Sequence, residues 1–199
     1  MFYDTSLFIL LLVKRKFMAS ILVSLDQLIE SNRKEYYSSL RPGLDDATIQ
    51  ILENRYGITL PEDLKNLYKW HDGQRYDNYE AFVNNCTFLQ LDQALDSAAE
   101  FTSMIGSDFE LPDMWHETWI PIFSNGGGDF ICYDLAGSFD GQAGQLIEYW
   151  HADNDRNIIA GNLSSFLQAL VELYQMYDPV DEYLQVEDLP GYPVRHVIG

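Results

Sequence analysis

Residues 119–150 read WIPIFSNGGGDFICYDLAGSFDGQAGQLIEYW, and this stretch decides the fold. It holds three runs of apolar and aromatic residues, at 119–123, 130–135 and 145–150, separated by two connections rich in glycine. β-Branched and aromatic residues bounded by such connections are typical of strands joined by turns. A further run at 156–160 closes a hairpin with the third one. The pattern therefore predicts an antiparallel meander.

The segments around this meander are predicted to be helices that cover it. The last one is the clearest, because its apolar residues recur at spacings of three and four. These are Leu163, Phe166, Leu167, Leu170, Val171 and Tyr174. Caps and breakers place helix starts near Ser24, at Asp45 or Asp46, at Pro61, at Asp92, and at Asn162 or Ser164. The matching ends are before Arg41, at Gly57, at Gly73, near Met104 and at Asp178. A short strand is expected at 87–91. The predicted fold class is α+β, an antiparallel or mixed sheet packed with several helices.

Length and cysteine content are consistent with one stable domain. The chain has 199 residues, 47% of them hydrophobic, which is enough to form a core without a disulfide or a metal. Its two cysteines, Cys86 and Cys132, have no short spacing between them. Such usage indicates a reducing compartment, so we expect a cytoplasmic protein.

Residues 1–17 differ from the rest of the chain. Seven apolar residues at 7–13 precede three basic residues at 14–16. The apolar run is too short to span a bilayer, and a signal peptide would carry its basic residues before that run. Met18 followed by two small residues resembles an ordinary start. We therefore expect 1–17 to be a disordered extension or a mis-assigned start, with a weak membrane-surface anchor as the alternative, and no stable membrane insertion.

Charge is divided unevenly along the chain, whose formal net charge is −19 at pH 7. Residues 1–75 carry ten of the 12 basic and ten of the 31 acidic residues. Residues 76–199 hold only Arg156 and Arg195 against 21 acidic residues. Such a surface is either simply well solvated or attracts a basic partner. Nucleic-acid binding is disfavoured, because no basic stripe is available to neutralise phosphates.

Two loop motifs invite a chemical interpretation, and each fits a structural one better. The sequence GGGD at 126–129 lies between two predicted strands, and no lysine follows Lys69. We therefore interpret it as a hairpin turn rather than a phosphate-binding loop. Residues 153–157 alternate oxygen ligands, but Ile158 and Ser164 stand where a calcium loop needs glycine and glutamate.

The reactive side chains form no recognisable centre either. Cys132 has apolar neighbours and is expected to be a buried core thiol. The four histidines are scattered and make no metal-binding pair: His71, His116, His151 and His196. We therefore expect no catalytic residue, no metal and no cofactor, and hence a protein that is not an enzyme.

Two blocks of residues, in this order and spacing, resemble the SUKH superfamily of the Smi–Knr type. The first lies within 44–73 and includes GITLPEDL at 57–64 and HDG at 71–73. The second combines WIPI at 119–122 and GGGD at 126–129 with the later short motifs CYD at 132–134, GQL at 144–146 and SFL at 165–167. The resemblance covers roughly residues 25–177 and is carried mostly by turn glycines and core aromatic residues.

The resemblance implies a SUKH-like α+β domain, which we place at 18–178, between the extension at 1–17 and a C-terminal tail at 179–199. It also implies binding without catalysis. Many bacterial members are immunity proteins that neutralise a toxin, often a nuclease, of a polymorphic toxin system. Fungal members regulate cell-wall synthesis as interaction scaffolds. We expect an immunity protein that binds a basic toxin domain, and we keep an intracellular regulatory scaffold as the alternative.

Carboxylates in the loops around the meander are the candidate contacts to a basic partner, because residues at turns and strand ends usually reach solvent. The candidates are Glu117, Asp129, Asp134, Asp153 and Asp155. Trp115 lies in an acidic loop and is the candidate aromatic anchor, whereas Trp119 and Trp150 are expected in the core.

Overall fold

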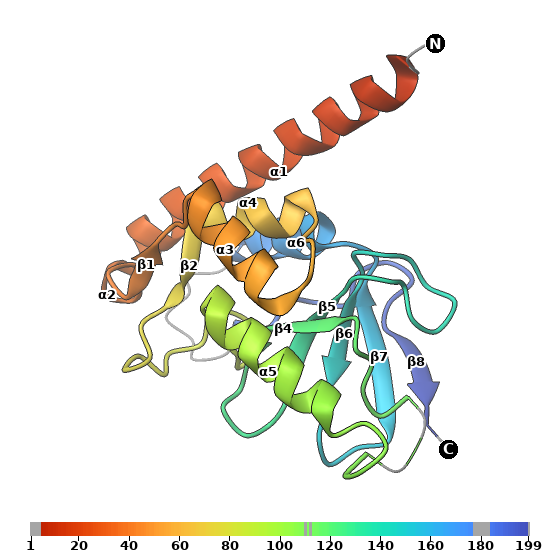
Figure 1. Cartoon of the computed structure of the whole chain (residues 1–199). Helices are drawn as coiled ribbons and strands as arrows, with labels where there is room; N and C mark the ends of the chain where they lie inside the picture. The colour runs from red at the N-terminus through yellow and green to blue at the C-terminus, as the bar shows by residue number, and fades with distance from the viewer. Residues whose placement is uncertain (1–4, 110, 112, 177–183, 199) are drawn as a thin grey trace.

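The computed structural model describes residues 5–109, 111, 113–176 and 184–198, with side chains from residue 16 onward (Figure 1). The helices are α1 (Thr5–Asn32), α2 (Lys34–Tyr37), α3 (Asp46–Tyr56), α4 (Glu62–Trp70), α5 (Leu91–Ser103) and α6 (Leu163–Met176). The strands are β1 (Leu40–Pro42), β2 (His71–Gln74), β3 (Thr87–Phe88), β4 (Trp119–Ser124), β5 (Phe130–Asp134), β6 (Leu146–Tyr149), β7 (Asp155–Ala160) and β8 (Val194–Val197). The predicted α+β class is confirmed.

The main sheet is a six-stranded antiparallel meander with the strand order β3-β4-β5-β6-β7-β8. Neighbouring strands are consecutive in the sequence. Short turns join β4 to β5 and β6 to β7, whereas the longer loop 135–145 joins β5 to β6. In the central hairpin, Phe130 pairs with Tyr149 and Tyr133 pairs with Leu146. A separate two-stranded sheet joins β1 to β2. The predicted meander is therefore present, with one strand added at each edge.

Both faces of this sheet are apolar. Every residue of β4 and β5 is buried, and side chains that alternate along a strand enter two different clusters. On one face, Ile131 and Tyr133 pack with residues of α1, α4 and α6. On the other face, Phe130 and Cys132 pack with Trp115 and other aromatic residues. Figure 1 shows α1 running across α4 and α6, with the sheet below them. The sheet is thus the middle layer of the fold.

The link between α3 and α4 follows the predicted local rules. The carboxylate of Asp45 accepts the Thr48 N–H at 2.7 Å and caps α3, and Gly57 ends the helix with a φ of 67°. The predicted end of the next helix at Gly73 is wrong, because α4 ends at Trp70 and residues 71–74 form β2. Gly73 has a φ of 67°, and a Cβ there would lie 2.5 Å from the backbone of Leu89 and Gln90. The glycine therefore allows a close backbone approach rather than a helix cap.

The start of α5 depends on a residue far away in the sequence. Asp92 was predicted to cap this helix, but α5 already begins at Leu91. Instead, the buried carboxylate of Asp72 accepts the Leu91 N–H at 2.9 Å. A long-range cap of this kind leaves no local sequence signal.

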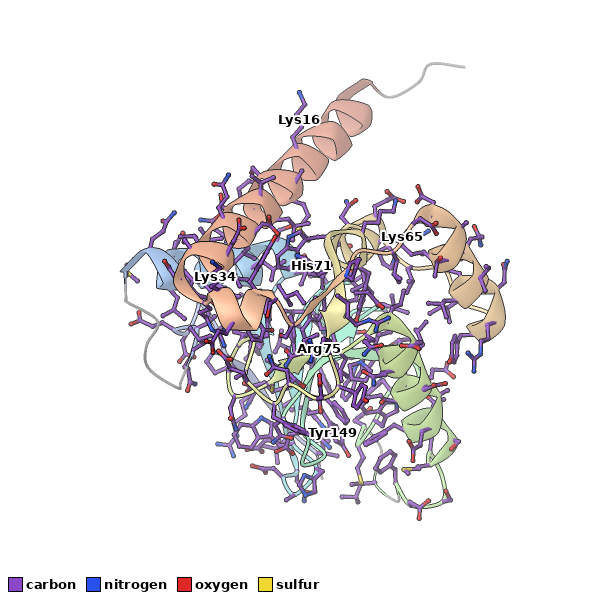
Figure 2. The ribbon with its side chains drawn as sticks, turned by 90° about the vertical axis from the view of Figure 1, so that its left-hand side faces the viewer. Lys16, Lys34, Lys65, His71, Arg75 and Tyr149 are labelled. Carbon is purple, nitrogen blue, oxygen red and sulfur yellow. The ribbon has the colours of Figure 1, made fainter. Side chains whose placement is uncertain are left out.

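The two ends of the chain differ most from the sequence-based expectations. Helix α1 begins at Thr5, not near Ser24, so residues 5–17 are helical; residues 1–4 lie outside the described part. Figures 1 and 2 show the first part of α1 projecting beyond the other elements. The tail also contributes structure, because β8 pairs with β7 and Ile198 is buried. Of the helices described, none is both long and apolar enough to cross a bilayer.

Removal of residues 1–17 should leave the fold intact. Phe17 is 48% exposed, whereas the buried face of α1 begins at Met18, which is 2% exposed. A chain that starts at Met18 keeps every described core contact of the helix. Its melting temperature should lie within a few degrees of that of the full chain in a thermal scan followed by circular dichroism. A large fall in melting temperature would show that the removed turns stabilise the domain.

Phe166 on α6 should be a main stabilising contact between the helical layer and the sheet. Its ring is buried, as predicted, and lies 6.1 Å from the ring of Phe123 on β4. Truncation to alanine should lower the free energy of unfolding by ~3–5 kcal/mol in urea titrations. The matched control is Glu172→Ala, at an exposed position of the same helix, which should change it by less than about 0.5 kcal/mol. Similar small effects at both positions would refute the assigned orientation of α6.

Candidate interaction surface

The glycine-rich turn between β4 and β5 is closed by its own side chains. The Asn125 Oδ1 accepts the N–H groups of Gly127 at 2.7 Å and Asp129 at 3.1 Å. The Asn125 Nδ2 donates to the Asp129 Oδ2 at 2.7 Å. Gly126 and Gly128 have φ values of 75° and 101°, which glycine adopts without strain. The N–H groups thus bond within the turn, which supports its interpretation as a structural hairpin.

Asp129 joins this hairpin to the neighbouring turn between β6 and β7. Its Oδ1 accepts the His151 N–H at 2.9 Å and lies 2.8 Å from the His151 Nδ1. Burial raises the pKa of Asp129, but the hydrogen bonds from His151 and Asn125 outweigh burial and hold that pKa below its usual value. The carboxylate is therefore charged at neutral pH, and the two turns lie side by side.

Arg156 on β7 fixes the second turn from inside the protein. Its side chain is fully buried, and its Nη1 donates to the carbonyl oxygens of Asp153 at 2.8 Å and Asp155 at 2.7 Å, and of Trp150 at 3.3 Å. The Nη2 donates to the Met114 carbonyl at 2.9 Å. The guanidinium also lies 4.5 Å from the centre of the Tyr149 ring. Burial lowers the pKa of Arg156 from its usual value. This cation binds backbone, not carboxylates.

The side chains that leave this end of the sheet are acidic and aromatic. Glu148 and Trp150 are two residues apart and so project to the same side. Trp150 is 51% exposed. The pKa of Glu148 is raised from its usual value, mainly because the group is buried. The charge of Asp188 raises it further, and a hydrogen bond from Asn157 lowers it only in part. Figure 2 places the labelled cations Lys16, Lys34 and Lys65 above, in the helical part, and Tyr149 at the lower end. At this end of the sheet, Arg156 is buried and Arg195 is ion-paired with Asp155.

The predicted contact carboxylates fall into two groups. Glu117 and Asp153 are exposed, as contact with a partner would require. Asp129 is half-buried and held by His151, and Asp155 is ion-paired with Arg195. Two of these carboxylates are therefore exposed and two are engaged, and the strand register places Glu117 at the opposite end of the sheet from the other three.

Asp134 and Trp115 must be corrected, because neither reaches solvent. Asp134 was expected to reach solvent from a strand end, but its carboxylate is fully buried and accepts the N–H groups of Ala136 at 3.0 Å and Ser138 at 2.5 Å. It also accepts from Gln145 Nε2 at 2.8 Å. Trp115 is 4% exposed and packs edge-on against Trp119. Asp134 thus holds the loop 135–145, and Trp115 is a core residue.

The structure also exposes aromatic residues that the sequence reasoning missed. Trp119 is buried as expected, but Trp150 is not, because its strand ends one residue earlier. Tyr76 and Tyr79 are 81% and 86% exposed in the loop before β3. The only available signal was their position among Asp and Asn residues, which indicates a loop but not its orientation.

The thiols are unsuited to nucleophilic chemistry. Burial raises the pKa of Cys86 to about 12 and holds the pKa of Cys132 well above its usual value, so both are protonated at neutral pH. Among the residues with described side chains, no three His, Cys, Asp or Glu are grouped to hold a metal ion.

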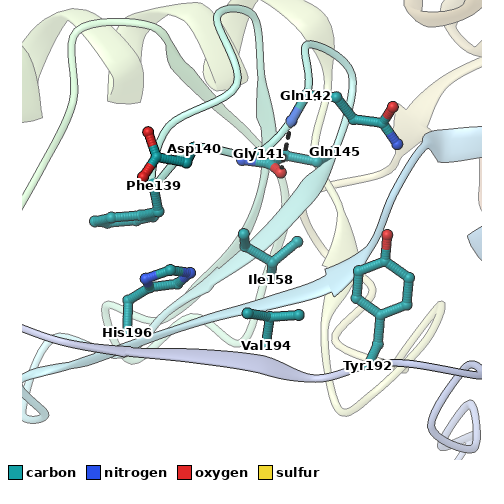
Figure 3. Close-up of a pocket in the computed structure, with 9 residues that line it drawn as sticks. All are labelled: Phe139, Asp140, Gly141, Gln142, Gln145, Ile158, Tyr192, Val194 and His196. Atoms are coloured by element: carbon teal, nitrogen blue, oxygen red, sulfur yellow. Dashed lines mark hydrogen bonds between the residues drawn. The ribbon is translucent and has the colours of Figure 1, made fainter.

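A hollow of about 360 Å³ lies between the loop 135–145 and β8 (Figure 3). Ile158 and Val194 form its floor, with Phe139 stacked on His196 at one end and Tyr192 at the other. Phe139 and Asp140 both have left-handed backbone, with φ values of 58° and 57°. Its lining also includes Asp140, and the His196 Nε2 is buried without a hydrogen-bond partner among the described groups.

Comparison with known proteins identifies relatives. The sequence model described as SMI1/KNR4 family (SUKH-1) matches residues 43–169. The cell wall biosynthesis/cell cycle regulator smi1 of Schizosaccharomyces pombe is 23% identical over 168 residues, covering 72% of this chain and 33% of that protein. The glucan synthesis regulatory protein of Neurospora crassa is 22% identical over 200 residues, covering 77% of this chain and 38% of that protein. The chain thus spans about a third of the length of these relatives.

Asp134 should be essential for stability, in contrast to the exposed carboxylates. Truncation to alanine leaves several buried donors without an acceptor, each costing about 1–3 kcal/mol. The change Asp134→Ala should therefore lower the free energy of unfolding by at least about 3 kcal/mol in urea titrations. The control Glu117→Ala, at an exposed position of the same acidic part, should change it by less than about 0.5 kcal/mol. Equal effects at the two positions would contradict the buried role of Asp134.

Proposed function

The chain belongs to the SMI1/KNR4 family (SUKH-1), and on this premise we propose that it is a regulatory binding module that acts by associating with a basic protein partner. Both curated relatives are named as regulators, which favours the scaffold alternative over the immunity protein that we expected first. Because the chain spans only part of those relatives, their cellular roles reach this chain only as a proposal.

The observation that carries this proposal is the unequal distribution of charge. The part from residue 76 onward has two basic residues, and neither offers a free cation: Arg156 is buried against backbone carbonyls and Arg195 is ion-paired with Asp155. Glu117 and Asp153 belong to the same part of the sequence, and both are exposed. A surface of this kind repels acidic partners and steers basic ones, so it supports both a basic partner and fast association.

A bacterial-type immunity protein is the second candidate function. The same acidic part would complement a basic toxin domain, such as a nuclease that binds nucleic acid. The two candidates differ in the partner: a toxin neutralised on co-expression supports immunity, and a component of cell-wall synthesis supports regulation. In either case we propose a cytoplasmic location, because Cys86 and Cys132 are both free thiols.

Charge reversal in the acidic part should weaken binding without loss of stability. The test captures the partner from source cells with the full chain, identifies it, and then measures association rates across a salt series. The double variant Glu117→Lys and Asp153→Lys should bind more slowly, and the wild-type rate should fall as the Debye length shortens from about 30 Å at 0.01 M to about 8 Å at 0.15 M salt. Melting temperatures should stay within a few degrees, because both side chains are exposed.

The matched control moves the same amount of charge elsewhere. The double variant Glu30→Lys and Glu35→Lys alters two exposed carboxylates in the neutral part of the chain. Its association rate should stay close to the wild-type value. A partner whose binding ignores both salt and the Glu117 and Asp153 reversals would rule out the electrostatic mechanism.

A further inference from the structure

We infer that the turn between β6 and β7, residues 150–154, is the anchor of the partner surface, and that the exposed indole of Trp150 receives an arginine or lysine side chain of the partner. The inference rests on the proposed function and specifies where the basic partner binds. Four features of this turn support it: its aromatic side chain, its rigidity, its surrounding charge and the absence of competing cations.

Trp150 is presented to solvent in a way that the other described aromatic residues of this sheet are not. Trp115 and Trp119 are 4% and 0% exposed, whereas Trp150 is 51% exposed at the end of β6. Trp150 lies two residues after Glu148, so the two side chains project to the same side of the sheet. About half of Trp150 stays open to solvent.

The backbone of the turn is fixed before any partner arrives. Arg156 bonds the carbonyl oxygens of Trp150 and Asp153 from inside the protein. Asp129 bonds the His151 N–H from the neighbouring hairpin. A rigid turn loses little conformational entropy on binding, which is the property that separates an interface anchor from an ordinary exposed side chain.

The charge around the indole favours a cation. Three carboxylates belong to the strand ends and turns at this end of the sheet: Asp129, Glu148 and Asp153. The charge of Asp188 is close enough to raise the pKa of Glu148. The described cation–π contacts place neither arginine of the acidic part over this ring: Arg156 is buried against Tyr149, and Arg195 is ion-paired with Asp155. Tryptophan is the best aromatic acceptor of a cation–π contact. An arginine or lysine side chain therefore suits both the exposed indole ring and the negative charge around it.

The tyrosine loop before β3 provides a contrast within the same protein. Tyr76 and Tyr79 are more exposed than Trp150, but the neighbouring carboxylates are already neutralised. Arg75 bonds Asp77 at 2.7 Å, and Arg33 bonds Glu80 at 2.5 Å. A loop with its charges satisfied internally attracts a cation less, which makes Tyr76 the matched control for an exposed aromatic residue.

The test uses the full chain, labelled with ¹⁵N, and a hexa-arginine peptide as the probe, with a hexa-glutamate peptide as the negative control at the same low salt. The indole N–H signal of Trp150 should shift on titration with hexa-arginine, while the signals of Trp115 and Trp119 stay in place. Trp150→Ala should raise the peptide Kd about fivefold, and Trp150→Phe should raise it less, because phenylalanine keeps a weaker cation–π contact. Tyr76→Ala should leave the Kd within a factor of two.

The outcomes separate this inference from the proposed function. An unchanged Kd in Trp150→Ala, together with weaker binding by the Glu117 and Asp153 reversals, would overturn the anchor while the basic-partner proposal stands. A wild-type chain that does not bind hexa-arginine would also overturn the inference that Trp150 is an anchor. The proposed function would then be tested only by identifying the captured natural partner. Circular dichroism of each variant confirms that its fold is intact before binding is compared.

Discussion

Both faces of the central strands are apolar, and this constraint governs how the rest of the chain is arranged. Ile131 faces one cluster and Cys132 the other, so neither face can be left to water. Helices cover the first face, and their backbone groups are satisfied within each helix. Loops supply much of the cover on the second face, and a buried loop backbone needs other partners. Buried polar side chains of this protein lie beside these loops and provide hydrogen-bond partners for their backbone.

Asp134 and Arg156 meet the need with opposite charges. The carboxylate of Asp134 accepts N–H groups of the loop 135–145, and the guanidinium of Arg156 donates to carbonyl oxygens around the turn 150–154. Neither forms an ion pair with the other in the described contacts; each compensates the partial charges of backbone dipoles. Because the rare cation of the acidic part is used inside, the outside keeps its negative field. The burial of Arg156 therefore stabilises the packing and, on our proposal, also leaves the surface negative for recognition of a basic partner.

Local patterns in the sequence predicted the elements well, since alternation, caps and glycine turns are short-range effects. The meander, the α3 cap at Asp45 and the stripe of α6 that contains Phe166 were all predictable in this way. The candidate surface was predicted less well, because exposure depends on which loop folds over which face. Asp134 is the last residue of β5, where a side chain often reaches solvent, yet the loop 135–145 closes over it. Trp115 and Trp150 exchanged their expected roles for the same reason. The cap of α5 by Asp72 was out of reach, because the contact spans nineteen residues.

The last strand has a consequence for how the sheet is completed during synthesis. The strands β4 to β7 follow one another in both sequence and space with no helix between them, so they can pair one after another as the chain emerges. The strand β8 follows only after α6 and an intervening segment, and until it pairs with β7 the outer edge of Asp155–Ala160 stays open. An open edge of this kind is a template for pairing with another chain. Pairing of residues 194–197 with β7 thus covers this edge last. The ion pair between Arg195 and Asp155 favours the correct register of the two strands.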